Sequence, residues 1–122
     1  MNDSRLMHIG GGWVPAAAGA VLESVDPSTE QVLATVPDAG AEDVEAAVGA
    51  ARAAAPGWRD LGWRRRAALL RELSDRIGAQ AEELARLDVR DSGNPLSGMR
   101  ADVTGACDEL LYYGGIAPEA RG

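Results

Sequence analysis

The spacing of apolar residues along this chain changes near position 40. Before it, apolar and polar residues alternate, as in 32–36, which is the period of a strand with one buried face. After it, apolar residues recur every three or four positions, as in 44–55, which is typical of one face of a helix. The sequence therefore predicts strands over residues 5–37 and helices over residues 41–115.

Two turn signals divide the strand region. Three glycines, Gly10–Gly12, separate Ile9 from Trp13 and favour a tight turn, because glycine adopts positive φ without a steric penalty. The second turn opens at Asp26, whose carboxylate can accept bonds from nearby backbone, and Pro27 fixes its own φ. Two β-hairpins are the simplest interpretation.

Three helices are expected after the hairpins. The first is expected to end at residues 56–57, a Pro-Gly pair. The second follows Trp63 and carries one long apolar stripe, in which Gly78 marks a break or a close helix contact. The third follows a loop at 91–95 and ends near 114–115. Strands followed by helices are typical of an α+β protein, or of one flank of a larger α/β domain.

Composition indicates elements that need something larger to pack against. Leu, Val and Ile together make up 24 of the 122 residues and there is no Phe, which is close to the composition of disordered chains, although here the apolar positions are periodic. The net charge of -7 disfavours nucleic-acid binding. No stretch approaches the ~20 apolar residues that a membrane-spanning helix needs. We expect neither nucleic acid nor membrane as a partner.

Cys107 is the candidate nucleophile, and a catalytic thiol needs a base or a helix amino terminus to lower its pKa. It lies instead late in a predicted helix on the apolar stripe, where cysteine behaves as a small hydrophobic residue. His8 is the only histidine and lies in a predicted strand. We therefore assign no catalytic residue. A single cysteine without a secretory signal at the amino terminus favours the cytoplasm.

Glycines and carboxylates give no clear ligand site. Gly10–Gly12 join two predicted strands, whereas the dinucleotide fingerprint needs spaced glycines between a strand and a helix. We therefore assign no cofactor-binding residue. Asp91 stays open, because it lies at a helix-to-loop junction where a carboxylate can organise backbone groups or hold a cation.

Several segments, in order and at the right distances, resemble the amino-terminal region of the aldehyde dehydrogenase superfamily. They are Ile9–Val14, Val25–Leu33, Ala41–Arg52, Asp91–Leu96 and Leu110–Gly115. The resemblance extends from about residue 6 to residue 122. It departs from the family at Gly40, where a Ser or Thr helix cap is usual, and at Asn94, where a Lys is common, so the substrate subgroup is not specified.

The resemblance implies an α+β fragment, two hairpins and three helices, that forms the outer part of a Rossmann-type α/β domain. It also implies NAD or NADP as the cofactor of the full-length family. The family's catalytic Cys, Glu and Asn and its dinucleotide loop lie beyond the end of this chain, so no cofactor is expected to bind this chain alone. Val25, through its carbonyl, and Asp91 match two positions that hold a monovalent cation in some members.

Three hypotheses follow. In the first, residues 1–122 are a truncated amino-terminal part of an NAD(P)-dependent aldehyde dehydrogenase, inactive alone, whose partner is the remainder of the enzyme or a full-length relative. In the second, the chain is a non-catalytic interaction module that binds a relative or another partner. In the third, it is an independent enzyme that uses Cys107, which the position of that residue disfavours.

Overall fold

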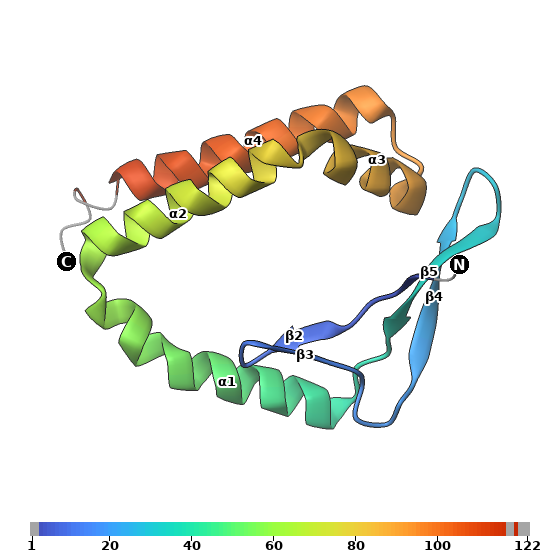
Figure 1. Ribbon diagram of the computed structural model, residues 1–122, viewed down its shortest axis with the longest axis horizontal. Helices are drawn as coiled ribbons and strands as arrows, with labels where there is room; N and C mark the ends of the chain where they lie inside the picture. Colours follow the sequence, from blue (N-terminus) through green and yellow to red (C-terminus); the bar gives the residue numbers. More distant parts are fainter. Residues whose placement is uncertain (1–2, 117–118, 120–122) are drawn as a thin grey trace. The chain divides into compact units, whose positions relative to one another are not determined.

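The computed structural model describes residues 3–116 and 119. The chain divides into two compact units, residues 1–56 and 57–122. The strands and most of the first helix belong to the first unit, and the other helices belong to the second (Figure 1). The division falls within the first helix, at Pro56.

The first hairpin consists of β2 (Met7–Ile9) and β3 (Gly12–Val14), which pair antiparallel. Gly10 and Gly11 connect them with φ of 62° and 87°. Two consecutive residues with positive φ make a turn whose twist matches that of the flanking strands, and glycine adopts it without strain. The predicted glycine turn is confirmed.

The second hairpin consists of β4 (Val21–Asp26) and β5 (Gln31–Pro37), with an irregular register between Ser24 and Val25. Asp26 organises the turn, as predicted: its Oδ1 accepts from the Ser28 N–H at 2.9 Å. A two-residue strand, β1 (Asp3–Ser4), pairs in parallel with β5 and was not expected, because two residues carry no alternation pattern. The α+β class is confirmed.

A buried carboxylate connects the loop after β3 to the first helix. Asp43 is only 7% exposed; its Oδ2 accepts from the Gly40 N–H at 2.9 Å and its Oδ1 from the Ala17 N–H at 3.0 Å. The bond to Gly40 is one half of a capping box, in which the third helical residue reaches back to the cap. Gly40 lacks the side chain for the other half, so Asp43 carries the whole interaction.

Helix α1 (Ala41–Asp60) does not end at Pro56, and the predicted stop was wrong. A proline inside a helix removes one main-chain donor and crowds the carbonyl four residues before it. The helical bonding nevertheless continues past Pro56, since the Leu61 N–H donates to the Gly57 carbonyl at 3.2 Å. The helix ends instead before Gly62, whose φ is 70°.

The long apolar stripe of the predicted second helix is divided between α2 (Gly62–Ala79) and α3 (Ala81–Ser92). The structure therefore has four helices among its described residues, where three were predicted. The break lies at Gln80, not at Gly78: Gln80 donates to the Ile77 carbonyl at 3.0 Å, and its own carbonyl accepts from Leu84. Spacing alone did not reveal the break, because the stripe keeps a helical period across it.

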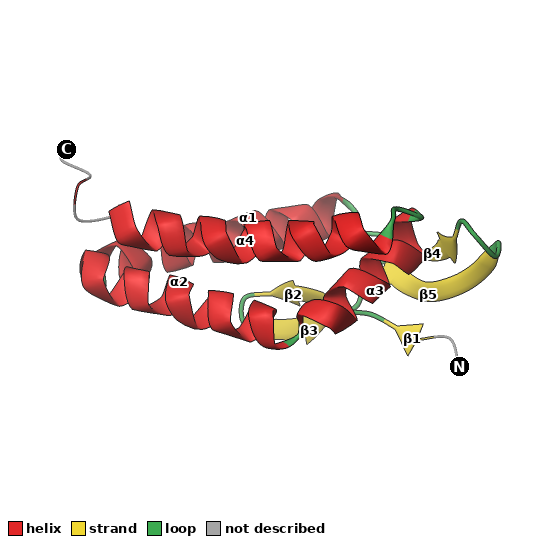
Figure 2. Ribbon diagram, turned by 90° about the horizontal axis from the view of Figure 1, so that it is seen from above, coloured by secondary structure: helices red, strands yellow, loops and turns green. Residues whose placement is uncertain are grey.

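Helices α2 and α4 (Leu96–Ile116) lie antiparallel and side by side (Figures 1 and 2). Small residues line the seam between them. The Ser74 hydroxyl donates to the Cys107 carbonyl at 3.2 Å, and the Cys107 thiol donates to the Ser74 carbonyl at 3.5 Å. Near the other end of the seam, a Cβ added to Gly114 would lie 3.5 Å from the Ala67 carbonyl oxygen. The predicted stop at 114–115 was early by one residue, since α4 continues to Ile116.

Helix α3 packs against the first half of α4. Ala85 is fully buried, and Met99 and Val103 of α4 are each 8% exposed. On the exposed side of these helices, Arg100 of α4 donates to both carboxylate oxygens of Glu82 at 2.8 Å. Arg86 forms an ion pair with the same carboxylate at 2.7 Å. The hydrogen bonds and charge of Arg100, with a smaller contribution from Arg86, lower the pKa of Glu82 from 4.5 to about 2.

Replacing Asp43 with Asn should destabilise the first unit. An Asn side chain has one acceptor oxygen for two N–H donors and directs its amide hydrogens at the other, which leaves a part-buried donor unsatisfied at a cost of about 1–3 kcal/mol. Urea unfolding followed by circular dichroism measures the loss, and faster exchange of the Ala17 and Gly40 amide protons locates it. Glu42→Gln is the matched control, because Glu42 is exposed and interacts with the helix dipole alone, worth about 0.5 kcal/mol.

Replacing Glu82 with Gln should lower stability at neutral pH and flatten its dependence on acid. Because the folded-state pKa of Glu82 is depressed, its contribution is complete above about pH 4.5 and is lost as the pH falls towards 2. Urea midpoints measured across that interval should change less in Glu82→Gln than in the parent. Glu72→Gln breaks a pair within α2 alone, with Arg76, and should reproduce the parent's slope. Equal slopes in all three proteins would contradict the assignment.

Candidate functional site

Cys107 lies on α4 at its seam with α2. It is half-buried, and its thiol and carbonyl both bond to Ser74. A Cβ added to Gly78 of α2 would lie 4.0 Å from the Cys107 sulfur. These contacts join two helices, and they fit the interpretation of Cys107 as a small packing residue.

His8 stacks against a neighbour across the first hairpin. It is paired in register with Trp13, and their ring centroids lie 5.0 Å apart at an interplanar angle of 59°. Both side chains are exposed. This cross-strand aromatic contact stabilises the hairpin and accounts for the histidine without chemistry.

The glycines of the first hairpin do not have the geometry of a dinucleotide cradle. That motif places glycines between a strand and the first turn of a helix, where main-chain N–H groups point at the pyrophosphate. Gly10 and Gly11 instead turn β2 into β3. These residues therefore do not fit an NAD(P) phosphate.

The two residues matched to a cation site lie in different units. Val25 lies on β4 opposite Val32, beside the register irregularity, and Asp91 lies in the last turn of α3. Within residues 3–116 and 119, no three His, Cys, Asp or Glu side chains come together to hold a metal ion. That finding does not concern main-chain carbonyls, and the pairing of Val25 with Asp91 stays a prediction.

Among the hollows that the described residues line, three lie each within a single unit. In the first unit, a hollow of about 550 Å³ lies between the turn of the first hairpin and the alanines of α1. It is lined by residues of 8–11 and of 47–54. In the second, an apolar groove of about 470 Å³ follows α2 and α4, and we call it the leucine groove. It is lined by Leu70, Leu73, Ile77, Ala106, Glu109, Leu110 and Tyr113.

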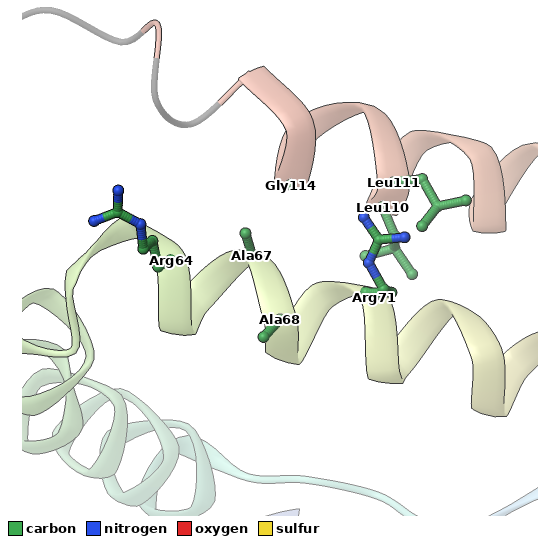
Figure 3. Close-up of a pocket in the computed structure, with 7 residues that line it drawn as sticks. All are labelled: Arg64, Ala67, Ala68, Arg71, Leu110, Leu111 and Gly114. Atoms are coloured by element: carbon green, nitrogen blue, oxygen red, sulfur yellow. The ribbon is translucent and has the colours of Figure 1, made fainter.

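The third hollow lies further towards the amino end of α2, and we call it the arginine hollow (Figure 3). It has a volume of about 230 Å³. Its lining consists of Arg64, Ala67, Ala68 and Arg71 from α2 and Leu110, Leu111 and Gly114 from α4. The small residues leave it open, and the two arginines make it basic.

Sequence reasoning missed two of these features. The role of Asp43 could have been found, since an acidic residue three positions after Gly40 is the capping-box spacing. The arginine hollow could not, because the run 64–66 looks like a solvated helix face and its partner Leu110 is distant in sequence. No described helix combines the length and apolar character needed to cross a membrane.

Comparison with known proteins identifies the family. The profile of the aldehyde dehydrogenase family matches residues 13–122. Hydroxyisobutyraldehyde dehydrogenase of Mycolicibacterium austroafricanum is 39% identical over 117 residues, which cover 96% of this chain and 23% of that protein.

Solved structures agree. The NAD-dependent aldehyde dehydrogenase of Sinorhizobium meliloti superposes with a TM-score of 0.94 at 32% identity, over 100% of this chain and 25% of that one. Lactaldehyde dehydrogenase of Escherichia coli superposes with a TM-score of 0.95 at 31% identity, over 100% of this chain and 26% of that one. This chain thus spans about a quarter of the length of these relatives. It belongs to the aldehyde dehydrogenase family, and it corresponds to the family's amino-terminal segment.

Proposed function

We propose that this chain serves as the amino-terminal segment of an NAD(P)-dependent aldehyde dehydrogenase, which oxidises an aldehyde to a carboxylic acid, and that it is inactive alone. The observation that carries the proposal is the family match over residues 13–122 by a chain that spans about a quarter of its relatives. In such an enzyme the nicotinamide accepts a hydride. No nucleophile, base or dinucleotide loop is assigned to this chain's own residues.

The exposed apolar surface of the second unit supports a partner. Leu73 is 45% exposed, and Tyr113, which lines the leucine groove beside it, is 60% exposed. No large side chain among the described residues is less than 2% exposed. Apolar area gains roughly 25 cal/mol per Å² when it leaves water, so a groove of this kind favours a covering surface. In this proposal the remainder of the dehydrogenase covers it.

The same proposal includes a cation and a compartment. In the assembled enzyme the Val25 carbonyl and the Asp91 carboxylate supply two oxygen ligands of a monovalent cation; hard cations prefer oxygen ligands. A cytoplasmic location is in keeping with the single cysteine, which has no internal disulfide partner. The acidic net charge is unfavourable for nucleic acid.

The purified chain should produce no NADH or NADPH above background with a panel of aldehydes. Hydroxyisobutyraldehyde and lactaldehyde belong in the panel because two relatives are named for them. Co-expression with the complementary three quarters of the Mycolicibacterium austroafricanum relative should give a complex that co-purifies and reduces NAD or NADP.

Cys107→Ser separates the remaining hypotheses. If the reacting thiol belongs to the other part, the co-expressed complex should keep its activity in this variant. Turnover by the isolated chain that Cys107→Ser abolishes would overturn the proposal in favour of an independent enzyme. Co-purification with a full-length relative, without any activity that depends on this chain, would favour an interaction module instead.

A further inference from the structure

The arginine hollow carries charge that the described part of the chain does not match. Within residues 3–116 and 119, neither Arg64 nor Arg71 forms an ion pair, whereas Glu82 and Glu72 each bind arginines elsewhere in the same unit. Arg64 lies over the Trp63 ring at 4.5 Å and has no carboxylate. The first turn of α2 contains no acidic residue, so Arg64 adds positive charge to the positive end of the helix dipole. This placement of positive charge disfavours folding of the chain when no anion is bound there.

The hollow has the size of side chains and not of a cofactor. Its volume is about 230 Å³, whereas pockets for small ligands run from roughly 300 to 1,000 Å³. Arg64 and Arg71 are seven residues apart on one helix, so their Cα atoms are separated by about 10 Å. Figure 3 shows the Arg64 side chain directed towards the amino end of α2, while that of Arg71 extends towards Leu110 and Leu111 of α4. One small anion is therefore a poorer match than two separate carboxylates.

We propose that the arginine hollow docks an acidic, extended segment of another polypeptide, with one carboxylate on each arginine and an apolar side chain between them. In an extended segment, residues i, i+2 and i+4 point to the same face, and the outer two are about 13 Å apart. A Glu-Ala-Leu-Ala-Glu sequence thus presents two carboxylates to the arginine forks and a leucine to Leu110 and Leu111. Arginine binds carboxylates through paired hydrogen bonds, which fixes the orientation of the segment.

Trp63 reports on this binding directly. The chain contains three tryptophans, and Trp63 alone lies beneath Arg64. Two-dimensional NMR of the indole N–H signals should show the Trp63 signal shifting saturably as the blocked peptide Glu-Ala-Leu-Ala-Glu is added at constant ionic strength. The Trp13 signal, from the first unit, should stay in place. The peptide with Gln in place of both Glu residues should cause no saturable shift.

Arg71→Gln should raise the dissociation constant of the acidic peptide at least fivefold and leaves the Arg64–Trp63 stack as the reporter. Arg90→Gln is the matched control: it removes the same charge from an exposed position on α3 outside the hollow and should change the constant less than twofold. Unaltered Trp13 and Trp58 signals in the free variants show that both remain folded. The proposal is overturned by an unmoved Trp63 signal, by equal binding of the Gln peptide, or by equal weakening in both variants. The measurement uses no cofactor, so its outcome is independent of the proposed dehydrogenase role.

Discussion

The close approach of α2 and α4 determines what the second unit of this chain can bury. Ala67 and Ser74 on one helix face Gly114 and Cys107 on the other, and the Ser74 and Cys107 side chains bond directly to the facing backbone. A seam of small residues brings helices together but removes little apolar area from water. The larger side chains therefore lie along the edges of the seam, where they form the leucine groove. The exposed apolar surface is a consequence of how the helices meet.

In the first unit, a buried polar contact holds the first helix to a neighbouring loop. Among its described residues, the apolar side chains that it buries most deeply are small, Ala16 and Ala34. The Asp43 carboxylate connects α1 to the loop after β3 by accepting from the Ala17 N–H, and it caps the helix by accepting from the Gly40 N–H. A carboxylate that accepts two N–H bonds at a helix start also complements the helix dipole, so one side chain provides both a cap and a connection.

The features that could be predicted from sequence are those with local causes. The hairpins followed from turn chemistry, because the positive φ at Gly10 and Gly11 and the Asp26 turn depend on a few adjacent residues. The helix boundaries were less accurate where tertiary contacts override local preference. Pro56 removes a single donor and did not end α1. The turn at Gln80 allows α3 to pack Ala85 against α4, and an uninterrupted apolar period gives no sign of it. The arginine hollow, built from residues some forty positions apart, has no local signature either.

Family membership concerns the fold, and the described groups that could do chemistry are engaged here in packing and turns. Catalysis by a thiol requires a sulfur that is accessible to substrate, near a base, and close to groups that stabilise an oxyanion. Cys107 is instead bonded to the backbone of a neighbouring helix, and the glycines of the first hairpin turn a strand and do not open a helix. The described residues of α2 and α4 form two surface features, the apolar leucine groove and the basic arginine hollow. Such surfaces support the proposed role of this chain as a segment against which the rest of a larger enzyme packs, because a fold can be inherited while the chemistry resides in other residues.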